Sequence, residues 1–306
     1  MNEAVEFPTE EQRPFPSLQE RQVVTARGRN TERLTSHPEK GKAFEGLAQR
    51  PYEFSLFNPG EKTGILILPA FGGHTGGIGL NFNHISQRYN ATIVTTQHPP
   101  WTFHPDFAIA QFEDLMEEQE FKDVVLVGPS LGGSLGLAIL RDYQQRHGFP
   151  FEVKGLVTLG TPTCRADLKP AVLAKLTAAI GLRRTIVAGR KLQRSPEKVL
   201  RHDATGAEQT DAEFHGQIAR AWALLRRLLK KGEYPNIPVL ALTLPPGKDQ
   251  TVKDSARERI KELFPQTTFD TFDAREHSQE EYVTHAKELA RKIGKFLDTV
   301  LKVEEK

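Results

Sequence analysis

The sequence predicts an α/β protein: a three-layer α/β/α sandwich with a mostly parallel central sheet and a helical cap insertion. Three observations lead to this prediction. Apolar strand candidates alternate with helical stretches of roughly 10–15 residues through most of the chain. One candidate, Ile65–Leu68, is an unbroken apolar run, typical of a parallel strand buried on both faces of a sheet. Residues 163–232 interrupt the alternation with helical periodicity and no convincing strand.

The individual elements follow from local patterns. Strands are expected where β-branched and large apolar residues lie between turn formers, at Glu53–Phe57, Ile65–Leu68, Ala91–Thr96, Val124–Val127, Gly155–Leu159, Val239–Thr243 and Thr267–Phe272. Helices are expected where apolar residues recur on one helical face, in a stretch ending near Tyr89 and at Phe107–Gln119, Leu131–Arg146, Ser255–Leu263 and Glu281–Val303.

The first 50 residues differ from the rest. They hold eight basic residues, eight acidic residues and four prolines, with no sustained hydrophobic period. This composition favours a solvated, partly disordered arm, with order beginning near Tyr52. The alternative is an extension that wraps the domain or a partner. We therefore divide the chain into an arm at residues 1–50, a core at 51–162 and 233–306, and a cap at 163–232.

Composition excludes several classes of protein. The 306 residues include 41 basic and 39 acidic ones, a net charge of +2, so a chain-wide nucleic-acid binder is not expected. The single cysteine excludes a disulfide framework and a cysteine-based zinc site. The longest apolar run, residues 65–71, is far shorter than the roughly 18–20 residues that span a bilayer. The N-terminus opens on acidic residues without a following apolar stretch, so we expect a cytoplasmic protein.

The most informative segment is Gly128-Pro-Ser-Leu-Gly132, which directly follows the strand Val124–Val127 and precedes a helix. A Gly-x-Ser-x-Gly match is weak by itself but strong in this strand–turn–helix setting. The glycines leave room for strand and helix to close together around the serine. The helix N-terminus directs free N–H groups at the same place. The other interpretation is a structural glycine-rich turn with a solvated serine.

A serine hydroxyl needs a base and an orienting acid to act as a nucleophile. The acid candidate is Asp249, in a Gly-x-Asp loop directly after the strand Val239–Thr243. Its competitor, Asp254, lies at the start of the following helix, where an aspartate often serves as a cap. The base candidate is His277, in the short loop after the last strand, because the other late histidine, His285, is expected at a surface position inside the closing helix.

With these segments in place, the chain resembles the α/β-hydrolase family from about Tyr52 onward. The resemblance lies in residues 65–73, 128–133, 239–252 and 272–277. It implies Ser130 as nucleophile, His277 as general base and then acid, and Asp249 as the group that fixes the imidazole tautomer. It also implies an oxyanion hole. One donor is the N–H of Leu131; the other corresponds to Phe71, although Pro69-Ala70 replaces the family's usual His-Gly. No cofactor or metal is implied.

Three further segments near these residues have two interpretations each. Gly160-Thr-Pro-Thr163 looks like the Gly-Thr-Pro turn of lipase-like family members, or is an ordinary proline-containing turn. The loop at residues 71–77 is glycine-rich but lacks the spacing of a phosphate-binding loop, so we interpret it as a mobile loop beside the site. Cys164 is expected to be a buried, inert thiol, because no assigned group activates it.

The predicted cap is basic. Residues 163–232 hold 15 basic and 6 acidic residues, a balance of +9. Within Gln217–Lys231, apolar residues occupy one helical face and arginines and lysines the other. A cap helix that buries its apolar face explains this pattern. The alternatives are a weak contact with an anionic membrane or attraction of an acidic substrate.

Together these observations predict a serine esterase that cleaves an acyl ester, a small-molecule substrate, through an acyl-enzyme intermediate. Acyl transfer, thioester or amide cleavage, and cofactor-free peroxidation are other reactions expected of the same residues. A non-catalytic small-molecule binder of the same fold is the remaining alternative.

Overall fold

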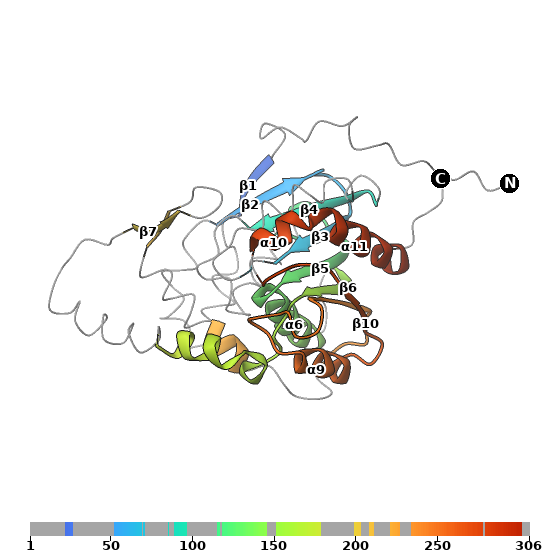
Figure 1. Ribbon diagram of the computed structural model, residues 1–306. Helices are drawn as coiled ribbons and strands as arrows, with labels where there is room; N and C mark the ends of the chain where they lie inside the picture. Colours follow the sequence, from blue (N-terminus) through green and yellow to red (C-terminus); the bar gives the residue numbers. More distant parts are fainter. Residues whose placement is uncertain are drawn as a thin grey trace.

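The fold is given by a computed structural model. It describes residues 22–26, 52–68, 70, 85, 89–96, 115–116, 118–145, 151–178, 199–202, 208–210, 221–226, 234–277 and 279–301. Within these residues, eight strands form one sheet in the order β1-β2-β4-β3-β5-β6-β9-β10 (Figure 1). Their bounds are β1 Gln22–Ala26, β2 Tyr52–Phe57, β3 Thr63–Ile67, β4 Ala91–Thr96, β5 Asp123–Pro129, β6 Glu152–Leu159, β9 Val239–Thr243 and β10 Thr268–Thr271.

Most of this sheet is parallel. The strands from β4 through β3, β5, β6 and β9 to β10 pair in parallel, whereas β2 is antiparallel to β4 and β1 is antiparallel to β2. The carboxyl ends of parallel strands lie at one edge of a sheet, and ligands of open α/β sheets bind outside that edge. The segments that follow β5, β6, β9 and β10 therefore meet at one place.

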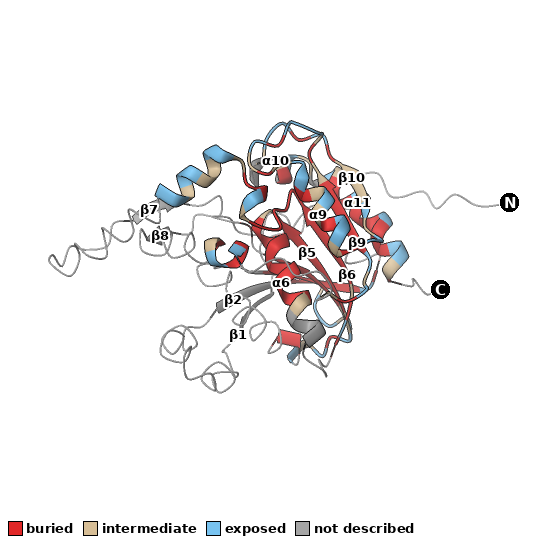
Figure 2. Cartoon of the chain, turned by 90° about the horizontal axis from the view of Figure 1, so that it is seen from below, coloured by how far each residue is buried: buried red, intermediate tan, exposed pale blue. Residues whose placement is uncertain are grey.

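Helices cover both faces of the sheet. Side chains alternate between the faces along a strand, so Leu66 and Leu126 belong to one buried cluster, and Ile65 and Val125 to the other. Helices α6 (Leu131–Gln145) and α9 (Ser255–Leu263) pack on the first cluster. Helix α11 (Ala286–Val300) packs on the second. Figure 2 shows the central strands and most of α6 buried, whereas α9 and α11 each expose one face. The predicted three-layer architecture is confirmed.

The predicted strands of the core are all present, with modest shifts at their ends. The predicted closing helix is in fact two helices, α10 (Gln279–Thr284) and α11, divided at His285. Of the helix predicted at Phe107–Gln119, residues 115–116 and 118–119 are helical and the remainder lies outside the described residues. The helical stretch predicted to end near Tyr89 also lies mostly outside them.

The prediction that order begins near Tyr52 is wrong for one part of the arm. Strand β1 pairs with β2, with Gln22 opposite Leu56 and Ala26 opposite Tyr52. The short run Gln-Val-Val-Thr-Ala forms this strand because β2 offers it the backbone groups of a sheet edge. This pairing agrees with the alternative in which the extension wraps the domain.

The interval predicted as a helical cap also contains strands. Residues 170–178 and 221–226 are helical. Between them, β7 (Val199–His202) and β8 (Glu208–Thr210) form a separate two-stranded antiparallel sheet. The expectation of no strand here is therefore wrong. Val199, Leu200 and Thr210 favour strand formation, and Gly206 lies in the short connection, but strands this short leave almost no periodic signal.

Candidate active site

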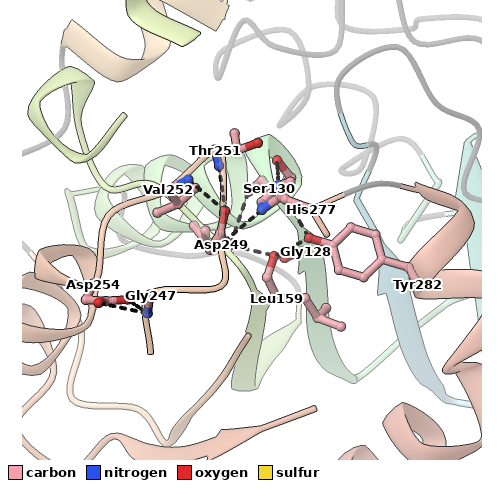
Figure 3. A network of polar contacts seen from close by, with 11 residues as sticks. Gly128, Ser130, Leu159, Gly247, Asp249, Thr251, Val252, Asp254, His277 and Tyr282 are labelled. Atoms are coloured by element: carbon pink, nitrogen blue, oxygen red, sulfur yellow. Dashed lines mark hydrogen bonds and ion pairs between the residues drawn. The ribbon is translucent and has the colours of Figure 1, made fainter. Parts of the chain in front are cut away.

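Ser130 lies on the sharp turn between β5 and α6, at the carboxyl edge of the sheet (Figure 3). Its φ is +50°, a left-handed conformation that is uncommon for a residue with a side chain. The Ser130 N–H donates to the Leu159 carbonyl of the next strand over a distance of 2.7 Å. A Cβ at Gly128 would lie 2.3 Å from the backbone nitrogen of Gly133, so this turn requires glycine at position 128.

The loop after β6 supports this turn from the neighbouring strand. The Thr161 hydroxyl donates to the Ser130 carbonyl, with its oxygen 3.1 Å away. From α6, the Ser134 hydroxyl donates to the Pro162 carbonyl over 2.6 Å. These contacts give Gly160-Thr-Pro a specific role: the segment holds the backbone on both sides of Ser130.

Ser130, His277 and Asp249 form a continuous hydrogen-bonded chain (Figure 3). His277 Nε2 lies 2.7 Å from Ser130 Oγ, and His277 Nδ1 lies 2.9 Å from Asp249 Oδ2. The side chains of His277 and Asp249 are only 6% and 9% exposed. The structure thus brings together the three residues that the sequence selected from separate loops after β5, β9 and β10.

The acid loop is built to hold an ionised carboxylate. Oδ1 of Asp249 accepts hydrogen bonds from the N–H groups of Thr251 and Val252, each over 2.8 Å. Burial raises the pKa of Asp249, but the hydrogen bond and charge of His277 and the two backbone donors outweigh it and leave the pKa below its ordinary value. A carboxylate only accepts, so Nδ1 of His277 carries the ring hydrogen, and Nε2 presents its lone pair to the Ser130 hydroxyl.

The two competing residues lie outside this chain of contacts. Asp254 occupies the N-cap position of α9, as predicted, but its carboxylate accepts from the Gly247 N–H over 3.2 Å and makes no side-chain capping bond to the helix. His285 occupies the N-cap position of α11 without a side-chain capping bond, and its ring nitrogens lie 3.3 Å from Glu281 and 3.6 Å from Glu288. Neither side chain hydrogen-bonds to Ser130 or His277.

The predicted oxyanion donors differ in how far the structure describes them. Leu131 is buried and is the first residue of α6. Its N–H is therefore one of the four that an α-helix leaves without an intrahelical partner. Phe71 lies outside the described residues, as does the rest of the glycine-rich loop at 71–77.

Two further polar side chains near the site residues or their loops were not predicted from the sequence. Tyr282 of α10 lies with its hydroxyl 3.4 Å from His277 Nε2. Asp167 is fully buried in the loop after β6. Its carboxylate accepts hydrogen bonds from the backbone N–H of Thr163 over 2.8 Å and from the Thr163 hydroxyl over 2.6 Å. It also forms an ion pair with Arg259 of α9 at 2.9 Å. No local signal could have identified either group, because both depend on contacts between distant segments.

The same loop also contacts the inserted segment. The Arg165 guanidinium stacks 3.8 Å above the Trp222 ring and donates from Nε and Nη2 to the Trp222 carbonyl at 3.1 Å and 2.9 Å. Burial, together with the nearby charge of Arg226, lowers the pKa of Arg165. The helix at 221–226 is thereby anchored to the loop after β6.

The described residues contain no group of three or more histidine, cysteine, aspartate or glutamate side chains placed to bind a metal. Cys164 is buried, as predicted, and its sulfur accepts a hydrogen bond from Arg259. Within the same residues, no helix is both long and apolar enough to cross a membrane.

The sheet order and the site position define the class of protein: the chain has the α/β-hydrolase fold. It is similar to an esterase of Thermogutta terrifontis, with 15% identity, a TM-score of 0.57, and 92% of this chain and 99% of that chain covered. A carboxylesterase structure of Nitrososphaera gargenis matches with 13% identity, a TM-score of 0.56, and coverage of 82% and 96%. A bromoperoxidase of Bacillus anthracis matches with 17% identity, a TM-score of 0.56, and coverage of 82% and 97%. No family model and no curated protein sequence matches this chain.

Proposed function

We propose that the protein is a serine hydrolase that cleaves a carboxylic ester through an acyl-enzyme intermediate. The observation that carries the proposal is the chain of hydrogen bonds from Ser130 Oγ through His277 to Asp249, with distances of 2.7 Å and 2.9 Å. A serine hydroxyl is activated in this way when a neighbouring imidazole accepts its proton and a carboxylate orients the ring. Several solved structures of similar fold are esterases, which supports the choice of an ester substrate.

The first half of the reaction forms the acyl-enzyme. Ser130 Oγ attacks the ester carbonyl carbon while its proton moves to Nε2 of His277, giving a tetrahedral oxyanion. Asp249 stabilises the resulting imidazolium through the Nδ1 hydrogen bond. The imidazolium then donates its Nε2 proton to the leaving alcohol oxygen as the carbon–oxygen bond breaks. In the second half, the oxygen of a water molecule attacks the acyl carbon while His277 takes a water proton. The imidazolium then returns this proton to Ser130 Oγ as the bond between Oγ and the acyl carbon breaks and the carboxylic acid leaves.

The tetrahedral oxyanion requires donors aimed at its oxygen. The N–H of Leu131 at the start of α6 supplies one donor, and the helix dipole adds to its effect. The N–H of Phe71 is the second donor in this proposal. Loss of one such donor costs about 3–4 kcal/mol of transition-state stabilisation.

The test is turnover of short and long p-nitrophenyl esters together with labelling by a fluorophosphonate probe. We expect the wild-type protein to hydrolyse at least one ester and to be labelled at Ser130. The Ser130→Ala variant should show neither property while it retains its unfolding midpoint. If wild-type protein neither hydrolyses any of the esters nor reacts with the probe, the proposal is wrong. Partitioning of the acyl group to an added alcohol or thiol would instead identify an acyltransferase.

A further inference from the structure

The buried hydroxyl of Tyr282 lies beside the reacting nitrogen of His277. Tyr282 is 2% exposed and comes from α10, the helix that follows the His277 loop. Its oxygen lies 3.4 Å from His277 Nε2 and 3.3 Å from the Leu159 carbonyl oxygen (Figure 3). The His277 and Tyr282 rings meet edge to face, with centroids 5.9 Å apart. The phenol therefore contacts the ring atom that exchanges a proton with Ser130.

The single hydroxyl hydrogen determines which role the phenol plays. Leu159 offers a carbonyl that only accepts, and this carbonyl already receives the Ser130 N–H. The lone pair of the neutral Nε2 receives the Ser130 hydroxyl. Tyr282 thus donates to Leu159 and turns its oxygen lone pairs toward Nε2. Burial, with a contribution from the charge of Asp249, raises the pKa of Tyr282, so the phenol keeps its hydrogen.

We propose that Tyr282 is a positioning residue for His277: its phenol oxygen accepts a hydrogen bond from the Nε2–H that His277 carries after taking the Ser130 proton. This inference rests on the proposed function. In the resting state Nε2 has no hydrogen, so the phenol makes no such bond. In the imidazolium state the single Nε2–H has Ser130 Oγ as its nearer partner, 2.7 Å away, and the phenol oxygen as a second acceptor at 3.4 Å. The interaction therefore favours the charged state that the reaction passes through.

Apart from Ser130 Oγ and the Tyr282 phenol, the described groups around His277 do not direct an acceptor at Nε2. Asp249 faces the opposite ring nitrogen, Nδ1. Glu281, which precedes Tyr282 on α10, accepts from the Arg275 N–H at 2.9 Å and pairs with His285. Gly160 contributes only backbone on the remaining side of the ring. Among the described groups that contact His277, Asp249 faces Nδ1, and Ser130 and Tyr282 face Nε2.

The experiment compares Tyr282→Phe with Tyr89→Phe as a matched control. Tyr89 is also a buried tyrosine whose hydroxyl lies within hydrogen-bond distance of α11, with its oxygen 2.6 Å from the Gly294 carbonyl oxygen and 2.7 Å from Asp298 Oδ1. In Tyr282→Phe we expect the acid limb of the kcat/KM profile to move to lower pH by about half a pH unit or more. We expect a several-fold lower kcat with KM unchanged. In Tyr89→Phe the profile should stay in place although stability falls. An unchanged limb in Tyr282→Phe, or one moved to higher pH, would overturn the inference.

Two NMR measurements separate this inference from the proposed function. The imidazole titration of His277 should move to lower pH in Tyr282→Phe even if the protein hydrolyses no ester, because the titration requires no turnover. In Ser130→Ala, which keeps Tyr282, the protonated ring should show an Nε2–H resonance protected from exchange with water, since the phenol is its partner. A freely exchanging Nε2–H in that variant contradicts the inference, whatever the stability of Tyr282→Phe.

Discussion

Replacement of Gly160 by alanine should displace the His277 ring and so lower activity. Gly160 has φ +55°, and a Cβ there would lie 2.9 Å from His277 Cε1, 3.0 Å from Nδ1 and 3.0 Å from the Tyr282 hydroxyl. Alanine in this conformation costs about 1–2 kcal/mol. The ring must also move by roughly half an ångström to restore ordinary contact, which strains the 2.9 Å bond to Asp249. Because a misplacement of about 1 Å can cost about 10²-fold in rate, we expect turnover to fall about 10- to 100-fold.

The control for this prediction is Gly60→Ala, in the turn between β2 and β3. Gly60 also has a positive φ, +100°, but a Cβ there meets nothing within 4 Å. Gly60→Ala should lose about 1–3 kcal/mol in urea unfolding with unchanged ester turnover, whereas Gly160→Ala should lose comparable stability and most of its activity. Equal turnover of Gly160→Ala and Gly60→Ala would refute the reasoning, since only backbone strain would then matter.

Three further predictions concern the acid loop and its support. Asp249→Asn should lower kcat by about 10⁴-fold because the amide no longer selects the required His277 tautomer, while the matched change Asp254→Asn should alter kcat less than about threefold, both by ester assay. The lowered pKa of Asp249 means that its contribution to stability is present above the unfolded value near 3.8 and is lost as the pH falls through the folded value. Unfolding of wild type should therefore show a steeper loss of stability than Asp249→Asn below about pH 4, and parallel curves would contradict this linkage. Arg259→Met should lower the free energy of unfolding by about 3 kcal/mol, because the buried Asp167 carboxylate loses its partner. Adding Asp167→Asn should restore part of that loss in urea unfolding. If the double variant is no more stable than Arg259→Met, the ion pair is not the cause.

The core strands and Ser130 could be predicted from sequence because their signals are local. A β-branched run such as Ala91–Thr96 indicates a strand by itself, and Gly128-Pro-Ser-Leu-Gly132 owes its meaning to the strand directly before it. Asp249 and His277 were found by their order along the chain and by their places after strands.

The features that escaped prediction depend on contacts between distant segments. Strand β1 exists because β2 pairs with it, and its five residues carry too little pattern to show this in advance. Arg259 lies on α9 among other charged residues and gains its role only from Asp167, which precedes it by 92 positions. Tyr282 carries no motif, because its role arises where α10 returns to the end of β6.

One loop, the segment at 160–169 after β6, contacts Ser130 and His277 and pairs with the loop that carries Asp249. Gly160 packs against His277, and Thr161 bonds to the Ser130 carbonyl. Its far end pairs with the acid loop: Lys169 donates to the Thr251 carbonyl at 3.0 Å, and the Lys253 N–H donates to the Asp167 carbonyl at 2.7 Å.

In this arrangement the hydrogen bonds of the buried Asp167 carboxylate offset the cost of its desolvation and hold the loop in place. Its bonds to Thr163 and Cys164 fix the middle of the loop between the end that contacts His277 and the end that pairs with the acid loop. The same loop carries Arg165, which is bonded to Trp222 of the inserted segment. The helix at 221–226 is therefore bonded to the same stretch of backbone that contacts Ser130 and His277 and that pairs with the loop carrying Asp249.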